Sequence, residues 1–389
     1  MWNACVSGLL ALVLATQVVE TSRCSPDQTT PAPAPTPPPV TPPSSEVFTT
    51  RDGVRFRVET VLTGLEIPWS MAFAPDGRLF VTERPGRVRV VNLATATSEV
   101  ALTLDDVNAV GEAGLLGLAL DPEFALNRFV YLHYTARVGT SAFNRIVRYR
   151  EVANRLGERA VLLDNIPAEQ IHDGGRLRFG PDGLLYATAG DAANPNLAQD
   201  AASLAGKILR ITRDGPSAPG NRFSSPVYTW GHRNPQGIDW HPTTGDLWAS
   251  EHGQTGNDEI NVIQSGANYG WPRIEGAATF PGMETPVAFF SPAIAPSGAS
   301  FYRGQRFSAF AGNLFVATLR GTHLLRLIID PASPRRIASQ ERLLEGTYGR
   351  IRDVVSGPDG YLYLCTNNRD GRGTPSATDD RLLRIVPAS

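Results

Sequence analysis

Lysine is nearly absent from this sequence of 389 residues, although its acidic and basic residues almost balance at a formal net charge of −2. The basic side chains are almost all arginines, and they are scattered between apolar stretches instead of gathered in one run. Such a chain has no broad positive field that could wrap a nucleic acid. The charge pattern argues against nucleic acid as a partner.

Cysteine is also scarce, with three residues in the whole chain. Cys5 lies inside a candidate N-terminal signal segment, Cys24 follows the apolar run of that segment, and Cys365 lies in a strand expected over residues 361–366. The main domain then holds at most one buried thiol. This argues against a disulfide framework and against a cysteine-based metal site.

The N-terminus lacks an apolar run of membrane-spanning length, because residues 6–19 are too short and too early in the chain. They suit the apolar part of a signal peptide instead. We predict a signal peptide over residues 1–24, a Pro/Thr-rich linker over 25–46, and export to the periplasm or the extracellular space. Cys24, followed by an extended tether, is similar to the start of bacterial lipoproteins. A lipid anchor through Cys24 and a cleaved or unmodified cysteine both stay open.

Helical periodicity is missing except over residues 198–208. Instead one pattern recurs from about residue 47: an apolar stretch, a turn resembling Pro-Asp-Gly, and a short alternating strand. In such a turn proline restricts φ, aspartate binds its own backbone and glycine accepts a positive φ. Each copy therefore predicts a β-hairpin. The six copies begin at Met71, Leu118, Leu177, Ile238, Phe310 and Val355.

The spacing of these copies suits four short strands in each repeat plus loops. Radial closure of such sheets removes long exposed edges. We predict an all-β fold, a six-bladed β-propeller of four-stranded antiparallel blades, in one domain over residues 47–389. An unclosed β-sandwich with accidental turns of this kind is the alternative.

His172 and Asp191 are the first candidates for chemistry, since they flank the two strands of one predicted hairpin. A propeller gathers the ends of its inner strands around one axis, so the carboxylate of Asp191 is expected to reach the imidazole. There it would fix the tautomer of His172 and raise its basicity, as a general base requires. The alternative reading makes His172 a turn or strand-end residue beside Gly-Gly.

Arginine and amide side chains form the second group of candidates. Arg233 and Asn234 lie in a Gly-rich segment over residues 231–237 and suggest an anionic or carbonyl-rich ligand, because arginine forms bidentate contacts with carboxylates. A polar network between blades is the alternative. Arg320 adds a further cation, and the alternation of Arg350 and Arg352 places both guanidinium groups on one face of a strand.

Oxygen donors concentrate in a loop predicted over residues 249–261 and in residues 266–272. Carboxylates, amides and flexible backbone carbonyls form the all-oxygen ligand set that calcium prefers. The segment lacks the spacing of an EF-hand. A calcium site and a plain cluster of Asx turns are both open at this point.

Taken together, the motifs resemble the glucose/sorbosone dehydrogenase family of soluble aldose dehydrogenases that use pyrroloquinoline quinone (PQQ). The resemblance covers about residues 56–387. Besides His172 and the Gly-Gly that follows it, its most specific pieces are Ile67-Pro-Trp-Ser-Met-Ala-Phe, Gly114-Leu-Leu-Gly-Leu-Ala-Leu, Gly231-His-Arg-Asn-Pro-Gln-Gly, Asp258-Glu-Ile-Asn and Asn268-Tyr-Gly-Trp-Pro.

This resemblance implies oxidation of an aldose sugar to a lactone, with hydride transfer to PQQ and an external electron acceptor. His172 matches the family's base, Asp191 matches its support, and Arg352 would also lie near the reacting face. By the same resemblance the cofactor contacts are Arg233, Asn234, Arg350 and Arg352, and the positions of Glu112 and Arg320 also belong to the cofactor site. We expect a monomer or homodimer.

The resemblance also implies two calcium ions. Gly253 and Gln254 match the loop whose backbone carbonyls hold the cofactor calcium, which polarises the quinone carbonyl as a Lewis acid. Glu259 and Tyr269 match ligands of a second, structural calcium.

Three positions depart from the family's usual residues. Gln254 stands where proline is common, Glu112 where glutamine is frequent, and Arg320 where lysine is often found. Arg320 can still pair with a carboxylate, but its geometry differs from that of lysine. Glu112 should repel an anionic cofactor unless it is protonated or paired.

Two other functions compete with the dehydrogenase. A calcium-dependent propeller lactonase would also use axial carboxylates and a histidine, and a non-catalytic binding module could keep the fold without the chemistry. The candidates gathered here are mainly arginine, asparagine and histidine, which favours the dehydrogenase.

Overall fold

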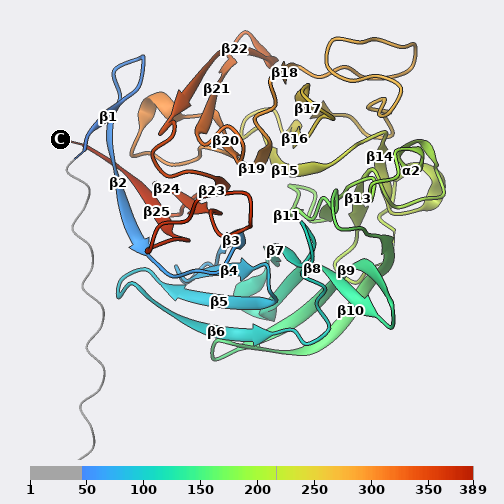
Figure 1. The fold of residues 1–389 in the computed structure, drawn as a ribbon, viewed down its shortest axis with the longest axis horizontal. Coiled ribbons are helices and arrows are strands. Elements are labelled where there is room, and N and C mark those ends of the chain that lie inside the picture. The colour runs from blue at the N-terminus through green and yellow to red at the C-terminus, as the bar shows by residue number, and fades with distance from the viewer. Residues whose placement is uncertain (1–45, 216, 389) are drawn as a thin grey trace, which may run out of the picture. The chain divides into compact units, whose positions relative to one another are not determined.

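The computed structural model describes residues 46–215 and 217–388. The predicted signal peptide, Cys24 and nearly all of the predicted linker lie outside the described residues. The strands form six antiparallel sheets arranged radially as the blades of a propeller (Figure 1). The predicted six-bladed β-propeller is thus confirmed.

The first three blades take their strands in chain order. Blade 1 contains β3 (Pro68–Phe73), β4 (Leu79–Glu83), β5 (Arg87–Asn92) and β6 (Thr97–Thr103). Blade 2 contains β7 (Leu115–Leu120), β8 (Phe129–Val138), β9 (Ser141–Val152) and β10 (Arg155–Pro167). Blade 3 contains β11 (Leu177–Phe179), β12 (Leu185–Ala189), β13 (Lys207–Ile211) and β14 (Val227–Trp230).

The last three blades complete the ring. Blade 4 contains β15 (Pro235–Trp240), β16 (Leu247–Glu251), β17 (Asp258–Ile263) and β18 (Ala288–Phe290). Blade 5 contains β19 (Pro296–Phe301), β20 (Leu314–Thr318), β21 (Leu324–Asp330) and β22 (Ser333–Leu343). Blade 6 contains β23 (Ile351–Ser356), β24 (Leu362–Thr366), β25 (Leu382–Pro387), β2 (Arg55–Leu62) and β1 (Phe48–Thr49).

The predicted turns join the first and second strands of their blades. In blade 1, Ala74 N donates to Arg78 O at 2.8 Å and Gly77 N donates to Ala74 O at 3.0 Å. Gly77 has a φ of +86°, a conformation that glycine adopts without a steric penalty. The hairpin prediction is confirmed, and the first strand of every blade contacts its neighbours around the centre.

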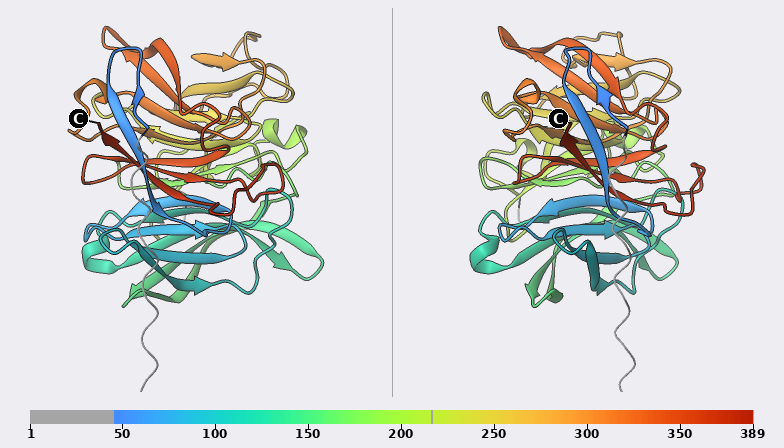
Figure 2. Two further views of the ribbon diagram at one scale, coloured as in Figure 1. Left: turned by 60° about the vertical axis from the view of Figure 1, so that its left-hand side comes forward. Right: turned by 90° about the vertical axis from the view of Figure 1, so that its left-hand side faces the viewer.

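The ring closes through strands from both ends of the described chain. Strand β2 pairs with β25 in antiparallel register, with Val58 opposite Ile385 (Figure 2). Strand β1 then adds a fifth strand at the outer edge, so blade 6 exceeds the predicted four. This pairing joins the two ends of the described chain within one blade, while the outermost strand of each blade stays at an edge.

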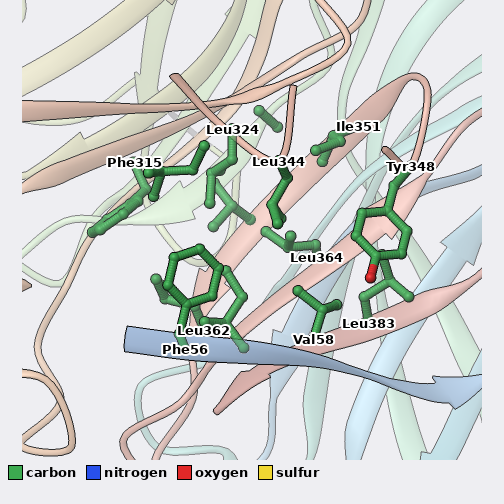
Figure 3. Packing of buried hydrophobic residues seen from close by; sticks show 14 of the residues in the cluster. Phe56, Val58, Phe315, Leu324, Leu344, Tyr348, Ile351, Leu362, Leu364 and Leu383 are labelled. Carbon is green, nitrogen blue, oxygen red and sulfur yellow. The ribbon is translucent and has the colours of Figure 1, made fainter. Parts of the chain in front are cut away.

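Apolar side chains fill the spaces between neighbouring blades. Between blades 5 and 6, Phe315 and Leu324 pack with Leu364, Leu383 and Phe56 (Figure 3). These residues are buried almost completely. Such packing holds each blade at a fixed angle to the next, and the inner strand ends are positioned by it.

Helices are few and short. They are α1 (Phe124–Asn127), α2 (Asn196–Gln199) and the 3₁₀ turns η1 (Arg222–Ser224) and η2 (Ser308–Phe310). The helical periodicity over residues 198–208 does not correspond to one helix: α2 ends at Gln199, Asp200 has an extended backbone, and β13 begins at Lys207. Gly206, with a φ of +68°, makes the turn between the two. Among the described residues, no helix is long and apolar enough to cross a membrane.

Candidate active site

His172 and Asp191 meet at the inner end of blade 3. His172 precedes β11 and Asp191 follows β12, and His172 Nδ1 lies 2.8 Å from Asp191 Oδ1. The carboxylate is buried, whereas the imidazole is partly exposed. A proton held on Nδ1 by the carboxylate leaves the lone pair on Nε2. The pair that the sequence predicted therefore has the arrangement of a base and its orienting acid.

The backbone of His172 adopts an unusual conformation, with a φ of +63°. Its N–H donates to Glu112 Oε2 at 3.2 Å, and its carbonyl accepts from Ala192 N at 3.2 Å. A Cβ added at Gly190 would lie 1.9 Å from the His172 carbonyl oxygen, so only glycine fits there. Positive φ at a non-glycine residue persists where the surroundings hold it.

Glu112 is paired, which meets the condition set for a carboxylate beside an anionic cofactor. Its Oε1 lies 2.5 Å from Arg372 Nη1, and its Oε2 accepts the His172 N–H. Burial alone would raise the pKa of Glu112, but His252 and Arg372 lower it to about 2. Burial also lowers the pKa of His252, which favours the uncharged imidazole. At neutral pH the positive charge that balances Glu112 therefore comes from Arg372.

Arg233 and Asn234 follow the buried His232 and precede β15. Arg233 Nη1 donates to His252 O at 3.2 Å, and its guanidinium lies 5.4 Å from the centre of the Trp271 ring. Asn234 Oδ1 accepts from Gly174 N at 3.0 Å. Arg233 Nε and Asn234 Nδ2 are buried and have no hydrogen-bond partner among the described residues.

Arg350 and Arg352 share a neighbour in Asp370. Arg350 Nη2 lies 2.7 Å from Asp370 Oδ2, and Arg352 Nη2 lies 4.0 Å from the same oxygen. Arg352 Nη1 also donates to Gln236 Oε1 at 2.8 Å on the inner strand of blade 4. Its Nε is buried and finds no acceptor within residues 46–215 and 217–388. Burial lowers the pKa of Arg352 to about 9.

These donors fit an acceptor-rich anion. Buried N–H groups without an acceptor cost free energy, and the site holds three of them on Arg233, Asn234 and Arg352. Both arginines also lower the pKa of His252, after the larger effect of its burial, so both lie near this ring. A planar tricarboxylate with carbonyl oxygens would supply the missing acceptors.

Arg320 lies farther out, at a cavity of about 510 Å³ that it lines with Arg350, Arg372 and Arg381. It is exposed and forms no hydrogen bond or ion pair with the described residues. The structure thus brings Arg320 to the same cavity as Arg350, with a free guanidinium.

Three of the four calcium candidates lie together. Gly253, Glu259 and Tyr269 line one small cavity, whereas Gln254 is exposed outside it. The Tyr269 hydroxyl donates to Val262 O at 2.7 Å and accepts from Gln264 N at 2.9 Å, so its backbone carbonyl is the better candidate for a metal ligand. The segment predicted as a loop is shorter than expected, because its first three residues belong to β16 and its last four to β17.

Glu259 lies opposite Glu251 on the neighbouring strand. Burial and the charge of Glu251 raise the pKa of Glu259 to about 8. A divalent cation would offset both effects, so this carboxylate fits a calcium ligand. In the part of the chain that the structure describes, no three histidine, cysteine or acidic side chains cluster as a metal site, and backbone carbonyls would have to complete the ligand set.

Comparison with known proteins identifies the family of this chain. The profile described as Glucose / Sorbosone dehydrogenase matches residues 65–384. The chain belongs to the glucose/sorbosone dehydrogenase family. It is similar to the aldose sugar dehydrogenase of Escherichia coli strain K12, with 31% identity over 355 residues, which are 85% of this chain and 92% of the relative.

Solved structures are similar to the chain over most of its length. The PQQ-bound aldose sugar dehydrogenase of Streptomyces coelicolor is 39% identical, with a TM-score of 0.78, and the match covers 88% of this chain and 98% of that one. An oxidoreductase of Thermus thermophilus is 45% identical, with a TM-score of 0.79 and coverage of 85% and 100%.

Sequence reasoning missed several residues of this candidate site. Trp271 and His252 lie in motifs noted above, but neither had been given a role. Trp271 Nε1 donates to Asp191 Oδ2 at 2.9 Å. Asp370 and Arg372 lie in a segment without any recognisable pattern, and only their contacts with Arg350 and Glu112 reveal them.

Proposed function

We propose that this protein oxidises aldose sugars to lactones with PQQ and calcium as cofactors. Its membership of the glucose/sorbosone dehydrogenase family and its similarity to a PQQ-bound aldose sugar dehydrogenase support an oxidoreductase of this class. The observation that carries the proposal is the His172–Asp191 pair beside buried arginines with unpaired donors. Bound PQQ would supply a two-electron acceptor for the hydride that leaves the sugar's C1.

The residues of the chain then act in sequence. His172 Nε2 takes the proton of the anomeric hydroxyl while the C1–H bond breaks, so the C1–O bond becomes the lactone carbonyl. Asp191 stabilises the imidazolium that forms, through the 2.8 Å contact with Nδ1. Arg352 would lie near the face of PQQ at which the sugar reacts. Its guanidinium lies 5.7 Å from the centre of the Trp69 ring.

The remaining candidates would hold the cofactors. Arg233, Asn234 and Arg350 would bind the carboxylates and carbonyl oxygens of PQQ, and Arg320 would add a cation at the outer cavity. The backbone carbonyls of Gly253 and Gln254 would hold the cofactor calcium. Glu259 and the Tyr269 carbonyl would hold a second calcium.

Reconstitution tests this function directly. Purified cofactor-free protein should gain dye-linked oxidation of glucose and other aldoses only when PQQ and calcium are added together. A lactonase would instead hydrolyse lactones with calcium alone, and a binding module would do neither. Activity with calcium alone, or no PQQ binding at micromolar concentrations, would refute the dehydrogenase.

The arginine cluster gives a second test in saturating calcium. Replacing Arg233, Arg350 or Arg352 by alanine should weaken PQQ binding about tenfold to a hundredfold, because each variant loses a charge-assisted contact. Arg384→Ala is the matched control, since Arg384 pairs with Glu59 on the outer strands of blade 6. Equal PQQ affinity in all variants would remove these arginines from the binding site.

We also propose export, supported by the apolar residues 6–19 and the Pro/Thr-rich segment that follows. The natural full-length chain should appear in the periplasmic or extracellular fraction of its host. Lipid labelling that disappears in Cys24→Ala would indicate a lipid anchor at Cys24. Secreted protein without the label would indicate simple cleavage of the signal peptide.

A further inference from the structure

Trp271 contacts both Asp191 and Arg233, the first beside the proposed base and the second among the proposed PQQ contacts. Its indole Nε1 donates to Asp191 Oδ2 at 2.9 Å. The backbone holds the ring in place, because Trp271 N donates to Gly231 O at 2.9 Å and Gln199 Nε2 donates to Trp271 O at 2.6 Å. The side chain is almost fully buried. The indole is therefore a fixed donor and not a mobile neighbour.

Each oxygen of Asp191 has a different set of donors. Oδ1 accepts from His172 Nδ1 at 2.8 Å and from Ala193 N at 3.0 Å. Among the described residues Oδ2 accepts from Trp271 alone. The carboxylate is fully buried, so losing the indole N–H would leave Oδ2 without a partner. The same loss would free the carboxylate to rotate away from the imidazole.

The ring face of Trp271 carries the second connection. The Arg233 guanidinium lies 5.4 Å from its centre, while Arg233 Nη1 donates to His252 O. Trp271 thus contacts both Asp191, which orients His172, and Arg233, whose Nε has no hydrogen-bond partner among the described residues. A substitution that keeps an aromatic face but removes the N–H separates these two contributions.

We propose that Trp271 is a positioning residue that orients the base by fixing the carboxylate of Asp191. This inference rests on the proposed role of His172. It predicts that the indole N–H acts on turnover through Asp191 and has little effect on sugar KM. Outer hydrogen bonds of this kind commonly change activity because they hold the inner group in its productive orientation.

Two matched tryptophan variants test the proposal in the PQQ- and calcium-loaded enzyme. Trp248 is also fully buried, but its indole N–H has no partner among the described residues. Trp271→Phe should lower kcat about tenfold or more, with KM and PQQ affinity nearly unchanged. Trp248→Phe removes a ring from the core and should lower thermal stability while kcat stays. Equal kcat in Trp271→Phe and wild type would overturn the proposal.

A double-mutant cycle shows whether the effect passes through Asp191. In an Asp191→Asn background, Trp271→Phe should cause little further loss, because the two groups act as one unit. The same fold loss in both backgrounds would mean that Trp271 acts elsewhere, and the proposal would fail.

A spectroscopic test does not depend on sugar oxidation. In the cofactor-free protein, Asp191→Asn should shift the ¹⁵N-indole resonance of Trp271 and leave that of Trp248 in place. An unmoved Trp271 resonance would overturn the assignment of this hydrogen bond. If the wild type bound PQQ but oxidised no sugar, the proposed function would fail separately, and the indole resonance would still decide on the Trp271–Asp191 arrangement.

Discussion

His172 combines an exposed edge with a strained and well-held backbone. Its φ of +63° lies in a region that non-glycine residues seldom adopt, and Glu112, Gly190 and Ala192 hold it there. Such conformations cluster at functional sites because the surrounding structure determines them. The strain and the carboxylate contact act together, since both fix the direction in which Nε2 points.

Replacing His172 by glutamine should lower kcat by about 10²-fold or more, as loss of a positioned general base does. Folding and PQQ affinity should change little, because the side chain is partly exposed. His241→Gln is a matched control, since His241 contacts the backbone of Thr243 and Thr244 in a turn of blade 4. Steady-state kinetics and PQQ titration provide the measurements. Turnover within about threefold of wild type would remove His172 from the chemistry.

Arg372 should matter through Glu112. Arg372→Ala leaves a carboxylate without its partner beside the proposed anion site, so PQQ affinity should fall about threefold to tenfold. Adding Glu112→Gln should restore it, because the repelling charge is then gone. Arg342→Ala, at an exposed pair with Glu345, is the control. Failure of the double variant to recover affinity would place Arg372 in direct contact with the cofactor.

Asp173 gives the protein a specific pH dependence of stability. Burial raises its pKa to about 7, and its Oδ2 has no partner among the described residues. Between about pH 4 and 7 the folded state then binds a proton that the unfolded state releases, so stability falls as pH rises. Relative to wild type, Asp173→Asn should gain about 2 to 3 kcal/mol in unfolding free energy between pH 5 and 8. A constant difference in urea unfolding at both pH values would contradict this assignment.

The segment between β12 and β13 is organised by Lys207, the only lysine of the sequence. Its ammonium donates to the carbonyls of Leu197, Ala198 and Ala205 at 2.8, 3.1 and 2.6 Å. These carbonyls belong to α2 and the turn that leads into β13. The same segment begins with Asp191, so its order contributes to the placement of the base's carboxylate.

Lys207→Met keeps the length of the side chain but removes the donor from three carbonyls. We expect the free energy of unfolding to fall by about 3 kcal/mol or more. Leu209→Met in the same strand is the control, because a volume-conserving apolar change costs less than about 1.5 kcal/mol. Urea unfolding compares the two. Equal stability of both variants would mean that water satisfies these carbonyls.

The hairpin repeat could be predicted because its signal is local. Proline, aspartate and glycine determine each turn within a few residues, as the hydrogen bonds around Ala74 and Gly77 illustrate. The helical periodicity over residues 198–208 misleads for the opposite reason: apolar residues such as Ile208 pack within a sheet, which periodicity alone cannot distinguish from a helix.

Contacts between residues far apart in the chain could not be predicted from the sequence. Trp271 and Asp191 are 80 positions apart, and Arg372 and Glu112 are 260 positions apart. Their spacing carries no local pattern. Trp271 reaches Asp191 from the next blade along the chain, whereas Arg372 of blade 6 meets Glu112 before blade 2 because the sheets close into a ring. The His172–Asp191 pair was accessible because both residues flank one hairpin, so its two strands already set the distance.

Calcium connects the site to the stability of the whole propeller. Glu251 and Glu259 face each other on adjacent buried strands of blade 4. In the metal-free protein the raised pKa of Glu259, about 8, means that stability falls as pH rises from about 4.5 to 8. Calcium needs the ionised carboxylate, so its affinity should rise over the same range.

Chelation should therefore lower the melting temperature, and by more at pH 8 than at pH 6. A ligand at a hundred times its Kd stabilises the folded state by about 2.7 kcal/mol. Glu259→Gln should abolish most of this response, whereas Glu284→Gln, at a half-buried position beside Gln264, should keep it. Thermal unfolding in calcium and in chelator, with elemental analysis of the same samples, makes the comparison. An unchanged melting temperature in chelated, metal-free protein would show that Glu259 holds a proton and not a metal, and the pair of glutamates would then be a structural feature of blade 4.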